Sequence, residues 1–176
     1  DLEVIVVDDE SSDGTAEWLA GHADPRLSVI RLERRLERSA ARNAGLARAR
    51  GRYVLFLDDD DRLVPTALDV LGRALERVPD AFVAGGRKVV FDDEGNRKSW
   101  PHPRRLWVGR PVRDVLLGWV LSPGECLWSA DVLRDAGGWR EDLSHAEDQE
   151  LWLRLAVERP AVIVPDTVLD NRTKVG

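Results

Sequence analysis

Two short apolar runs, each ending in aspartates, constrain the fold of this chain more than any other feature. Residues 2–7 and 53–57 are nearly continuous runs of apolar side chains, and they end in Asp8-Asp9 and in Asp58-Asp59-Asp60-Asp61. Such runs predict strands that are buried on both faces of a parallel sheet. Because ligands of these sheets bind outside the carboxyl ends of the strands, we expect both acidic groups to face one crevice.

Helical patterns alternate with the strands, which predicts an α/β fold with a mixed, mostly parallel sheet flanked by helices. Further strands are expected at residues 27–32, 81–84, 89–91, 126–128 and 161–164. Helices are expected at residues 15–21, 39–50 (ended by Gly51), 112–120, 131–136 and 146–158, and after Pro65 with Leu68, Leu71 and Leu75 inward. A hydrophobic content of 43% in 176 residues suits one globular domain.

The composition excludes several classes of protein. A net charge of −6 without a dominant basic stripe argues against nucleic acid as a partner. Cys126 is the one cysteine, so a reducing, cytoplasmic location is expected. No apolar run approaches the ~20 residues that span a bilayer, and no signal peptide is visible. Since the chain lacks Met and opens with Asp1, we interpret it as a fragment.

The acidic run at residues 58–61 predicts a metal site. On an extended backbone, residues i and i+2 point the same way, so Asp58 and Asp60 would project together. Neighbouring carboxylates repel each other unless a cation joins them, and Mg²⁺ or Mn²⁺ accepts such ligands together with phosphate oxygens. The alternative is a solvated acidic turn that caps the next helix.

The segment that begins with Asp8-Asp9 continues as Ser-Ser-Asp-Gly-Thr. A carboxylate at the end of a strand can accept a hydrogen bond from the imide N–H of uracil or from a ribose hydroxyl. Alternatively, Asp8 and Asp9 only shape the turn, while Asp13 caps the short helix that follows.

A third acidic group stands before the last amphipathic helix, in which Leu151, Trp152 and Leu155 are expected to face inward. In the functional interpretation, Asp148 points into a cleft as a general base. In the alternative, Ser144 and Glu147 form a capping box, and Asp148 only interacts with the positive helix N-terminus.

In this order the segments resemble the family 2 glycosyltransferases, which are inverting enzymes. The resemblance is carried by residues 6–15 (VVDDESSDGT), 41–45 (ARNAG), 51–61 (GRYVLFLDDDD), 137–139 (GGW) and 147–154 (EDQELWLR). It implies the Rossmann-like GT-A fold of nucleotide-diphospho-sugar transferases and a hexosyltransferase-type activity.

The resemblance also implies roles for individual residues. Asp9 would contact the nucleotide base, and Asp148 would be the catalytic base. Asp58 and Asp60 would form the family's DxD element, with Asp60 the more direct ligand of Mg²⁺ or Mn²⁺ and Asp58 also close to the substrate. Arg42 would assist the base or the donor phosphates, unless it is only a solvated helix arginine.

Glu147 is a further candidate for substrate binding. The implied donor is a nucleotide-diphospho-sugar, and the implied acceptor is the hydroxyl of a saccharide, a lipid-linked molecule or another compound. The base would take the acceptor proton while the sugar passes through an oxocarbenium-like state. The metal would neutralise the departing diphosphate.

The departures from the family pattern refine these expectations. A strand and a helix normally precede the Asp-Asp strand, so we expect an N-terminally truncated domain and activity only in a longer parent. Gln149 is not followed by the Gln-x-x-Arg-Trp pattern of processive synthases, which favours the transfer of one sugar per event. No histidine follows the final strand, and Arg172 or Lys174 would replace it electrostatically.

Within the single domain of residues 1–176, we assign nucleotide and metal binding to residues 1–95 and the acceptor and the base to residues 96–176. Residues 97–125 are expected as an irregular loop followed by a helix on the acceptor side, with Trp119 in the core and Trp100 and Trp107 either stacked on sugar or buried. Peripheral association with the inner face of the membrane would depend on parts outside this chain.

Three other functions compete with this one. A non-catalytic relative would bind sugar nucleotides without turnover. A receiver-type signalling domain would hold Mg²⁺ with the same carboxylates, but it requires a Lys-Pro pair that does not occur in the chain. A nucleotidyltransferase would need a basic, glycine-rich phosphate loop near its start.

Overall fold

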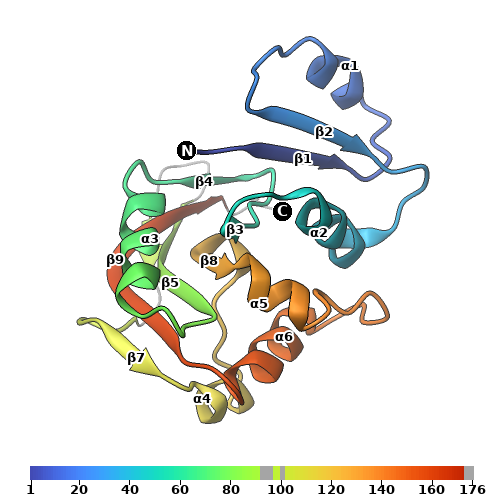
Figure 1. The fold of residues 1–176 in the computed structure, drawn as a ribbon. Helices are drawn as coiled ribbons and strands as arrows, with labels where there is room; N and C mark the ends of the chain where they lie inside the picture. Colours follow the sequence, from blue (N-terminus) through green and yellow to red (C-terminus); the bar gives the residue numbers. More distant parts are fainter. Residues whose placement is uncertain (92–96, 100–101, 173–176) are drawn as a thin grey trace. The chain divides into compact units, whose positions relative to one another are not determined.

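The computed structural model describes residues 1–91, 97–99 and 102–172 and confirms the α/β fold (Figure 1). The chain forms two compact units. The first contains residues 1–54 and 130–147, and the second contains residues 55–129 and 148–176. The short strand β3 (Tyr53–Leu55) crosses the boundary between them. These units differ from the functional division at residues 95 and 96, which stays a prediction.

The first unit is built on a parallel pair of strands. β1 (Val4–Asp8) pairs with β2 (Leu27–Arg31), so that Asp8 stands opposite Arg31. The unit also contains α1 (Thr15–Ala20), α2 (Glu37–Arg48) and α5 (Ala130–Asp135). A side chain at Gly45 of α2 would meet Val7, so α2 packs closely on β1.

The end of α2 differs from the prediction. The helix ends at Arg48, followed by Ala49 in an extended conformation, instead of continuing to a cap at Gly51. The reason is a distant carboxylate. Glu3 Oε1 accepts the backbone N–H groups of Arg50 (2.8 Å) and Gly51 (3.1 Å), which holds these residues in a turn outside the helix.

The second unit contains a mixed sheet, in which β8 (Cys126–Ser129), β5 (Val83–Phe91), β9 (Ala161–Arg172) and β4 (Asp61–Leu63) follow one another. β6 (Arg97–Ser99) pairs with β5, and β7 (Trp107–Gly109) pairs with β9. The long β5–β9 pairing is parallel, whereas the pairings of β4, β6, β7 and β8 are antiparallel.

β5 and β9 are longer than predicted. β5 joins the two strands expected at residues 81–84 and 89–91, and it runs through Gly85 and Gly86. These glycines leave room for neighbouring side chains, because a Cβ at Gly85 would overlap Leu121 and one at Gly86 would overlap Val168. They are therefore packing positions within a strand and not a turn.

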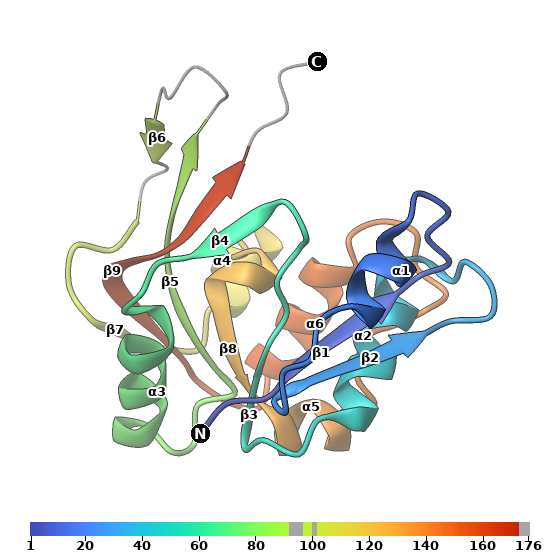
Figure 2. The same cartoon turned by 90° about the horizontal axis from the view of Figure 1, so that it is seen from above.

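Aromatic packing forms the core of the second unit. This unit also contains the helices α3 (Ala67–Arg77), α4 (Val112–Leu116) and, from its second residue on, α6 (Glu147–Ala156), together with a short 3-10 turn (Pro123–Glu125) (Figure 2). Trp152 of α6 is fully buried. Its ring lies 5.3 Å from Phe82, 5.6 Å from Trp128 and 6.1 Å from Trp119. The inward position of Trp152 is thus confirmed, whereas Trp119 lies against its ring and is half-buried.

The predicted core stripes are also confirmed. Leu71 and Leu75 of α3 and Leu151 and Leu155 of α6 are buried, while Leu68 is half-buried. α4 ends at Leu116 and not at Val120, because the chain turns at Gly118, whose φ is 88°. None of the helices in the described ranges combines the length and apolar character that crossing a bilayer requires.

A few predicted features fall outside the description. The hairpin turn at residues 92–96, Trp100 and Lys174 lie outside the described residues, and for Arg172 only the backbone is described.

Candidate active site

The acidic run forms a turn, so the extended backbone from which Asp58 and Asp60 were selected is wrong. β3 ends at Leu55, and the N–H of Asp61 donates to the carbonyl oxygen of Asp58 over 3.1 Å, with Asp59 and Asp60 at the corners. Side chains in such a turn do not alternate between two faces. The pleat therefore does not distinguish Asp59 from its neighbours, and Asp58 and Asp60 as metal ligands stay a prediction.

Asp61 anchors this turn to the sheet. It is the first residue of β4 and stands opposite Asn171 of β9, whose Nδ2 donates to Asp61 Oδ1 over 2.6 Å. Its other carboxylate oxygen lies 3.6 Å from the position that a Cβ on Gly124 would occupy. The sequence did not indicate this role for Asp61. Its partner Asn171 lies in the segment after the final predicted strand, where the family pattern would place a histidine.

The turn meets the chemical requirements of Mg²⁺ or Mn²⁺. These ions are typically held by one or two carboxylates together with substrate phosphates and water. The turn offers Asp58 and Asp60 on a backbone that Asp61 fixes at the edge of the sheet. Within the described parts of the chain, no group of three or more His, Cys, Asp or Glu side chains could hold a metal alone. Phosphate oxygens of a donor would have to complete the site.

Asp148 lies in the first turn of α6, in the same unit as the acidic turn. Its charge acts on the buried thiol of Cys126, whose pKa is raised far above its usual range by burial and then by Glu125 and Asp148, while Lys88 opposes the shift. The next residue, Gln149, donates its side-chain N–H to the carbonyl oxygen of Val115 over 2.8 Å. Asp148 itself is half-buried.

The predicted capping box before α6 is wrong. The helix begins at Glu147, so Glu147 is its first residue and not its third. Ser144 Oγ instead lies 2.9 Å from Nδ1 of His145. Ala146 adopts a φ of 59°, a left-handed conformation that is uncommon for a residue with a side chain. This turn leaves the carboxylate of Glu147 available for arginines of α2.

Arg42 of α2 is a buried residue, so its alternative as a solvated helix arginine is wrong. Only 9% of the residue is exposed, and its guanidinium carbon lies 4.6 Å from the centre of the Trp139 ring. Arg42 Nη1 lies 3.7 Å from Glu147 Oε1, and Arg38 Nε lies 3.4 Å from the same oxygen. Glu147 therefore orients Arg42, while substrate binding by either residue stays a prediction.

The neighbouring Asn43 joins the same group of residues. Its side chain accepts a hydrogen bond from the Trp139 N–H (2.8 Å) and donates one to the Trp139 carbonyl oxygen (2.9 Å). Gly138 is required beside it, because a Cβ there would lie 2.5 Å from the Asn43 side-chain oxygen. Two motifs about a hundred residues apart in the sequence thus support one buried arginine.

We expect that replacing Glu147 by Gln destabilises the protein by about 1–3 kcal/mol, because the buried Arg42 then loses the charge of the Glu147 carboxylate beside it. Chemical denaturation monitored by circular dichroism measures the change. Glu37→Gln is the matched control, because Glu37 also pairs with an arginine, at 3.4 Å, but both side chains are exposed. Equal stability of the two variants would contradict the role of the buried pair.

Asp8 and Asp9 are both engaged within the first unit. Asp8 is buried, and hydrogen bonds from the hydroxyl and N–H of Ser11, helped by Arg31, hold the pKa of its carboxyl below the usual value. The ionised Asp8 carboxylate stabilises the folded protein at neutral pH, and this contribution is lost as the pH falls through the lowered pKa. For Asp8, a structural role in the turn is confirmed.

The two carboxylate oxygens of Asp9 accept the N–H groups of Leu36 (2.8 Å) and Glu37 (3.0 Å) where α2 begins. Asp9 thus ties the end of β1 to α2, and its contact with a nucleotide base stays a prediction. Asp13 accepts the N–H and hydroxyl of Thr15, but the residue that caps α1 is Gly14.

Comparisons with known proteins agree with the fold and the motifs. The family model described as Glycosyl transferase family 2 matches residues 1–127. The chain is 48% identical over 119 residues to the putative teichuronic acid biosynthesis glycosyltransferase TuaG of Bacillus subtilis, covering 66% of this chain and 47% of the relative. It is 30% identical over 153 residues to the UDP-Glc:alpha-D-GlcNAc-diphosphoundecaprenol beta-1,3-glucosyltransferase WfgD of Escherichia coli, covering 87% and 57%.

Solved structures show the same fold. The crystal structure of TarS residues 1–349 from S. aureus superposes with a TM-score of 0.79 at 22% identity, covering 97% of this chain and 51% of that one. Its complex with UDP-GlcNAc superposes with a TM-score of 0.78. The chain covers less than two thirds of the length of these relatives. The receiver and nucleotidyltransferase alternatives are excluded by the family match.

Proposed function

This chain belongs to glycosyltransferase family 2, and on that basis we propose that the protein transfers a sugar from a nucleotide-diphosphate sugar to an acceptor hydroxyl with inversion. The observation that carries the proposal is the presence of the acidic turn and Asp148 in one compact unit. In this unit Asp61 fixes the turn and Gln149 fixes the start of α6. A base and a carboxylate pair of this kind are the parts that an inverting transfer needs.

In the proposed reaction, Asp148 removes the proton from the acceptor hydroxyl as that oxygen attacks the anomeric carbon. The bond to the diphosphate breaks on the opposite side of the sugar, through an oxocarbenium-like state. Asp58 and Asp60 would hold Mg²⁺ or Mn²⁺, which would supply positive charge for the departing diphosphate. Asp148 keeps the proton and passes it to water after the product leaves.

The first unit supplies the donor-binding residues in this proposal. Arg42 contributes a fixed positive charge for the donor phosphates, and Glu147 is the positioning residue that holds Arg42. Asp9 contacts the nucleotide base, as the family resemblance implies. The bonds of Asp9 to α2 support this role, because they keep its carboxylate in a fixed place.

The names of relatives guide the choice of substrates. One relative is named for transfer from UDP-Glc to a saccharide on diphosphoundecaprenol, and TarS structures contain UDP and UDP-GlcNAc. Others are named for the biosynthesis of teichuronic acid and colanic acid. We therefore propose a UDP-sugar donor, a lipid-linked saccharide acceptor, one sugar per event, and a cytoplasmic location at the inner face of the membrane.

A thermal-shift experiment on the full-length protein tests the donor and the metal. We expect one of the UDP-, GDP- or dTDP-sugars to raise the melting temperature only when Mn²⁺ is present. A donor at 100 times its Kd contributes about 2.7 kcal/mol, which is roughly 5–10 °C for a domain of this size. Asp58→Asn and Asp60→Asn should abolish the shift, because each removes a charged ligand oxygen.

Asp59→Asn is the matched control, since it removes the same charge from the same turn. It should keep the metal-dependent shift. Loss of the shift in Asp59→Asn but not in Asp58→Asn would overturn the choice of ligands. A shift of equal size without metal would overturn the metal site itself.

A further inference from the structure

Two leucines at the end of α4 are exposed to an unusual degree. Leu116 is 63% exposed and Leu117 is 75% exposed, the latter being the highest value for a large apolar side chain in the described residues. The backbone holds them outward. Val115 is fully buried, and the N–H of Trp119 donates to the carbonyl oxygen of Asp114 over 2.9 Å as the chain turns at Gly118.

The leucines lie beside the residue that we propose as the base. The carbonyl oxygen of Val115 accepts the side-chain N–H of Gln149 over 2.8 Å, and Gln149 follows Asp148 directly. Further along, Trp152 Nε1 donates to the carbonyl oxygen of Leu121 over 3.2 Å. The segment from residue 115 to 121 therefore follows the first turns of α6, and the exposed leucines come directly after the residue that contacts Gln149.

Basic side chains accompany the leucines. Residues 102–120 contain four arginines and one aspartate, which gives a charge of +3 in a chain whose net charge is −6. The arginines are all exposed: Arg104, Arg105, Arg110 and Arg113. Leu106 and Val108 between them are 51% and 46% exposed.

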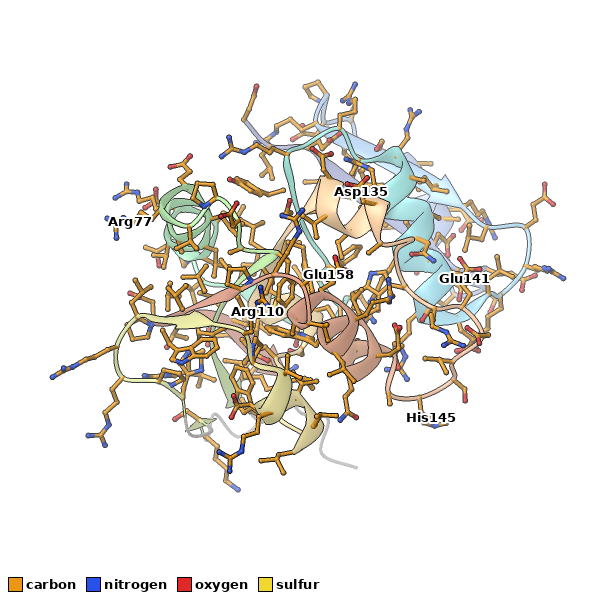
Figure 3. All side chains as sticks on the ribbon, turned by 60° about the horizontal axis from the view of Figure 1, so that its bottom comes forward. Arg77, Arg110, Asp135, Glu141, His145 and Glu158 are labelled. Carbon is orange, nitrogen blue, oxygen red and sulfur yellow. The ribbon has the colours of Figure 1, made fainter. Side chains whose placement is uncertain are left out.

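The strand and the helix that carry these side chains are neighbours. β7 leads into α4 through Arg110, which Figure 3 labels, and Pro111. Arg110 Nη1 donates to the carbonyl oxygen of Val157 over 3.2 Å, and Val157 is itself 55% exposed. We call the exposed side chains of this segment the basic-apolar surface; they are the four arginines and Leu106, Val108, Leu116 and Leu117.

We propose that the basic-apolar surface docks on an anionic lipid bilayer and that Asp148 takes its acceptor from that bilayer. The docking specifies the membrane location proposed above and does not depend on the transfer reaction, whereas the acceptor part rests on the proposed function. Leucines at such a surface enter the boundary between headgroups and acyl chains, and arginines attract anionic headgroups. The local charge of +3 attracts anionic headgroups even though the chain as a whole is negative.

Vesicle flotation with the full-length protein tests the proposal. We expect binding to vesicles that contain phosphatidylglycerol and little binding to pure phosphatidylcholine. Replacing both leucines, Leu116→Ser with Leu117→Ser, should weaken binding by on the order of 10-fold. Replacing the four arginines by glutamine should weaken vesicle binding by roughly 5-fold for each arginine replaced. It should also remove the dependence of vesicle binding on salt concentration.

Two matched controls share the chemistry of these changes but lie elsewhere. Val29→Ser replaces an apolar side chain that is 44% exposed on β2, and Arg77→Gln replaces an exposed arginine at the end of α3. Both variants should bind vesicles like the unmodified protein. Equal binding by the leucine variant would overturn the proposal. Loss of self-association or of binding to another protein, with vesicle binding unchanged, would identify a protein partner and also overturn it.

The donor-dependent thermal shift, measured on the same variants, separates the two proposals. The leucine and arginine variants should keep that shift, because none of these residues binds the donor. If the unmodified protein binds vesicles but no nucleotide sugar, the proposed function fails and the docking surface stands. If it binds the donor but not the vesicles, the docking surface fails and the function stands.

Discussion

Replacing Asp148 by Asn should lower the turnover number for sugar transfer by a factor of about 10²–10⁴, the usual contribution of a general base. Asparagine has nearly the same shape but cannot take the acceptor proton. Donor binding should be unchanged, because the proposed ligands of the donor are other residues. Steady-state kinetics of the full-length protein, with donor affinity measured separately by calorimetry, distinguish the two effects.

Glu150→Gln is the control for this change. Glu150 lies on the same helix and loses the same charge, but it forms a pair with Arg154 at 2.8 Å. It should retain nearly full turnover. An Asp148→Asn enzyme with unchanged turnover would show that the base is a different residue. A parent protein that binds a sugar nucleotide and never turns it over would be the non-catalytic relative.

Replacing Trp152 by Ala should cost about 3–5 kcal/mol of unfolding free energy, a large part of the roughly 5–15 kcal/mol that stabilises a typical domain. The side chain is fully buried, contacts three other aromatic rings and donates a hydrogen bond to Leu121. Removing it leaves a cavity and an unpaired carbonyl oxygen. The midpoint of urea denaturation measures the loss.

Trp18→Ala is the matched control for the core substitution. Trp18 is 63% exposed and stacks only on His22, with 4.0 Å between ring centres. Its removal should change the unfolding free energy by about 0.5 kcal/mol or less. A similar loss in both variants would mean that Trp152 is not the centre of the core of the second unit.

Features that depend on local pattern were predictable from the sequence. The apolar runs at residues 2–7 and 53–57 are close to β1 and β3, although their predicted burial on both faces is wrong, because Leu2, Val4 and Leu57 are exposed. The leucines of α3 and α6 face inward as their spacing indicates. Hydrophobic periodicity depends only on residues that are close in the sequence, so it can be recognised before the tertiary structure is known. Gly85 and Gly86 misled the prediction because their partners, Leu121 and Val168, come from distant parts of the chain.

The details of the candidate site depend on contacts that local rules do not contain. The pleat was applied to Asp58 and Asp60, whereas a hydrogen bond between Asp61 and Asp58 closes a turn there. The capping rule was applied to Glu147, whereas its partners are arginines of α2. The partners of Glu147 come from a distant part of the sequence, whereas the turn at residues 58–61 is a local backbone feature that the acidic pattern did not indicate.

The division of the chain into two units has a consequence for its synthesis. Neither unit is a continuous segment, since residues 130–147 of the first unit follow three quarters of the second in the sequence. On the ribosome, α2 therefore emerges long before Trp139 and Glu147. The contacts of Arg42 with the Trp139 ring and the Glu147 carboxylate form only after those residues have been made. The first unit reaches its final packing only after residues 130–147 have been translated, and neither unit can be isolated by a single cut of the chain.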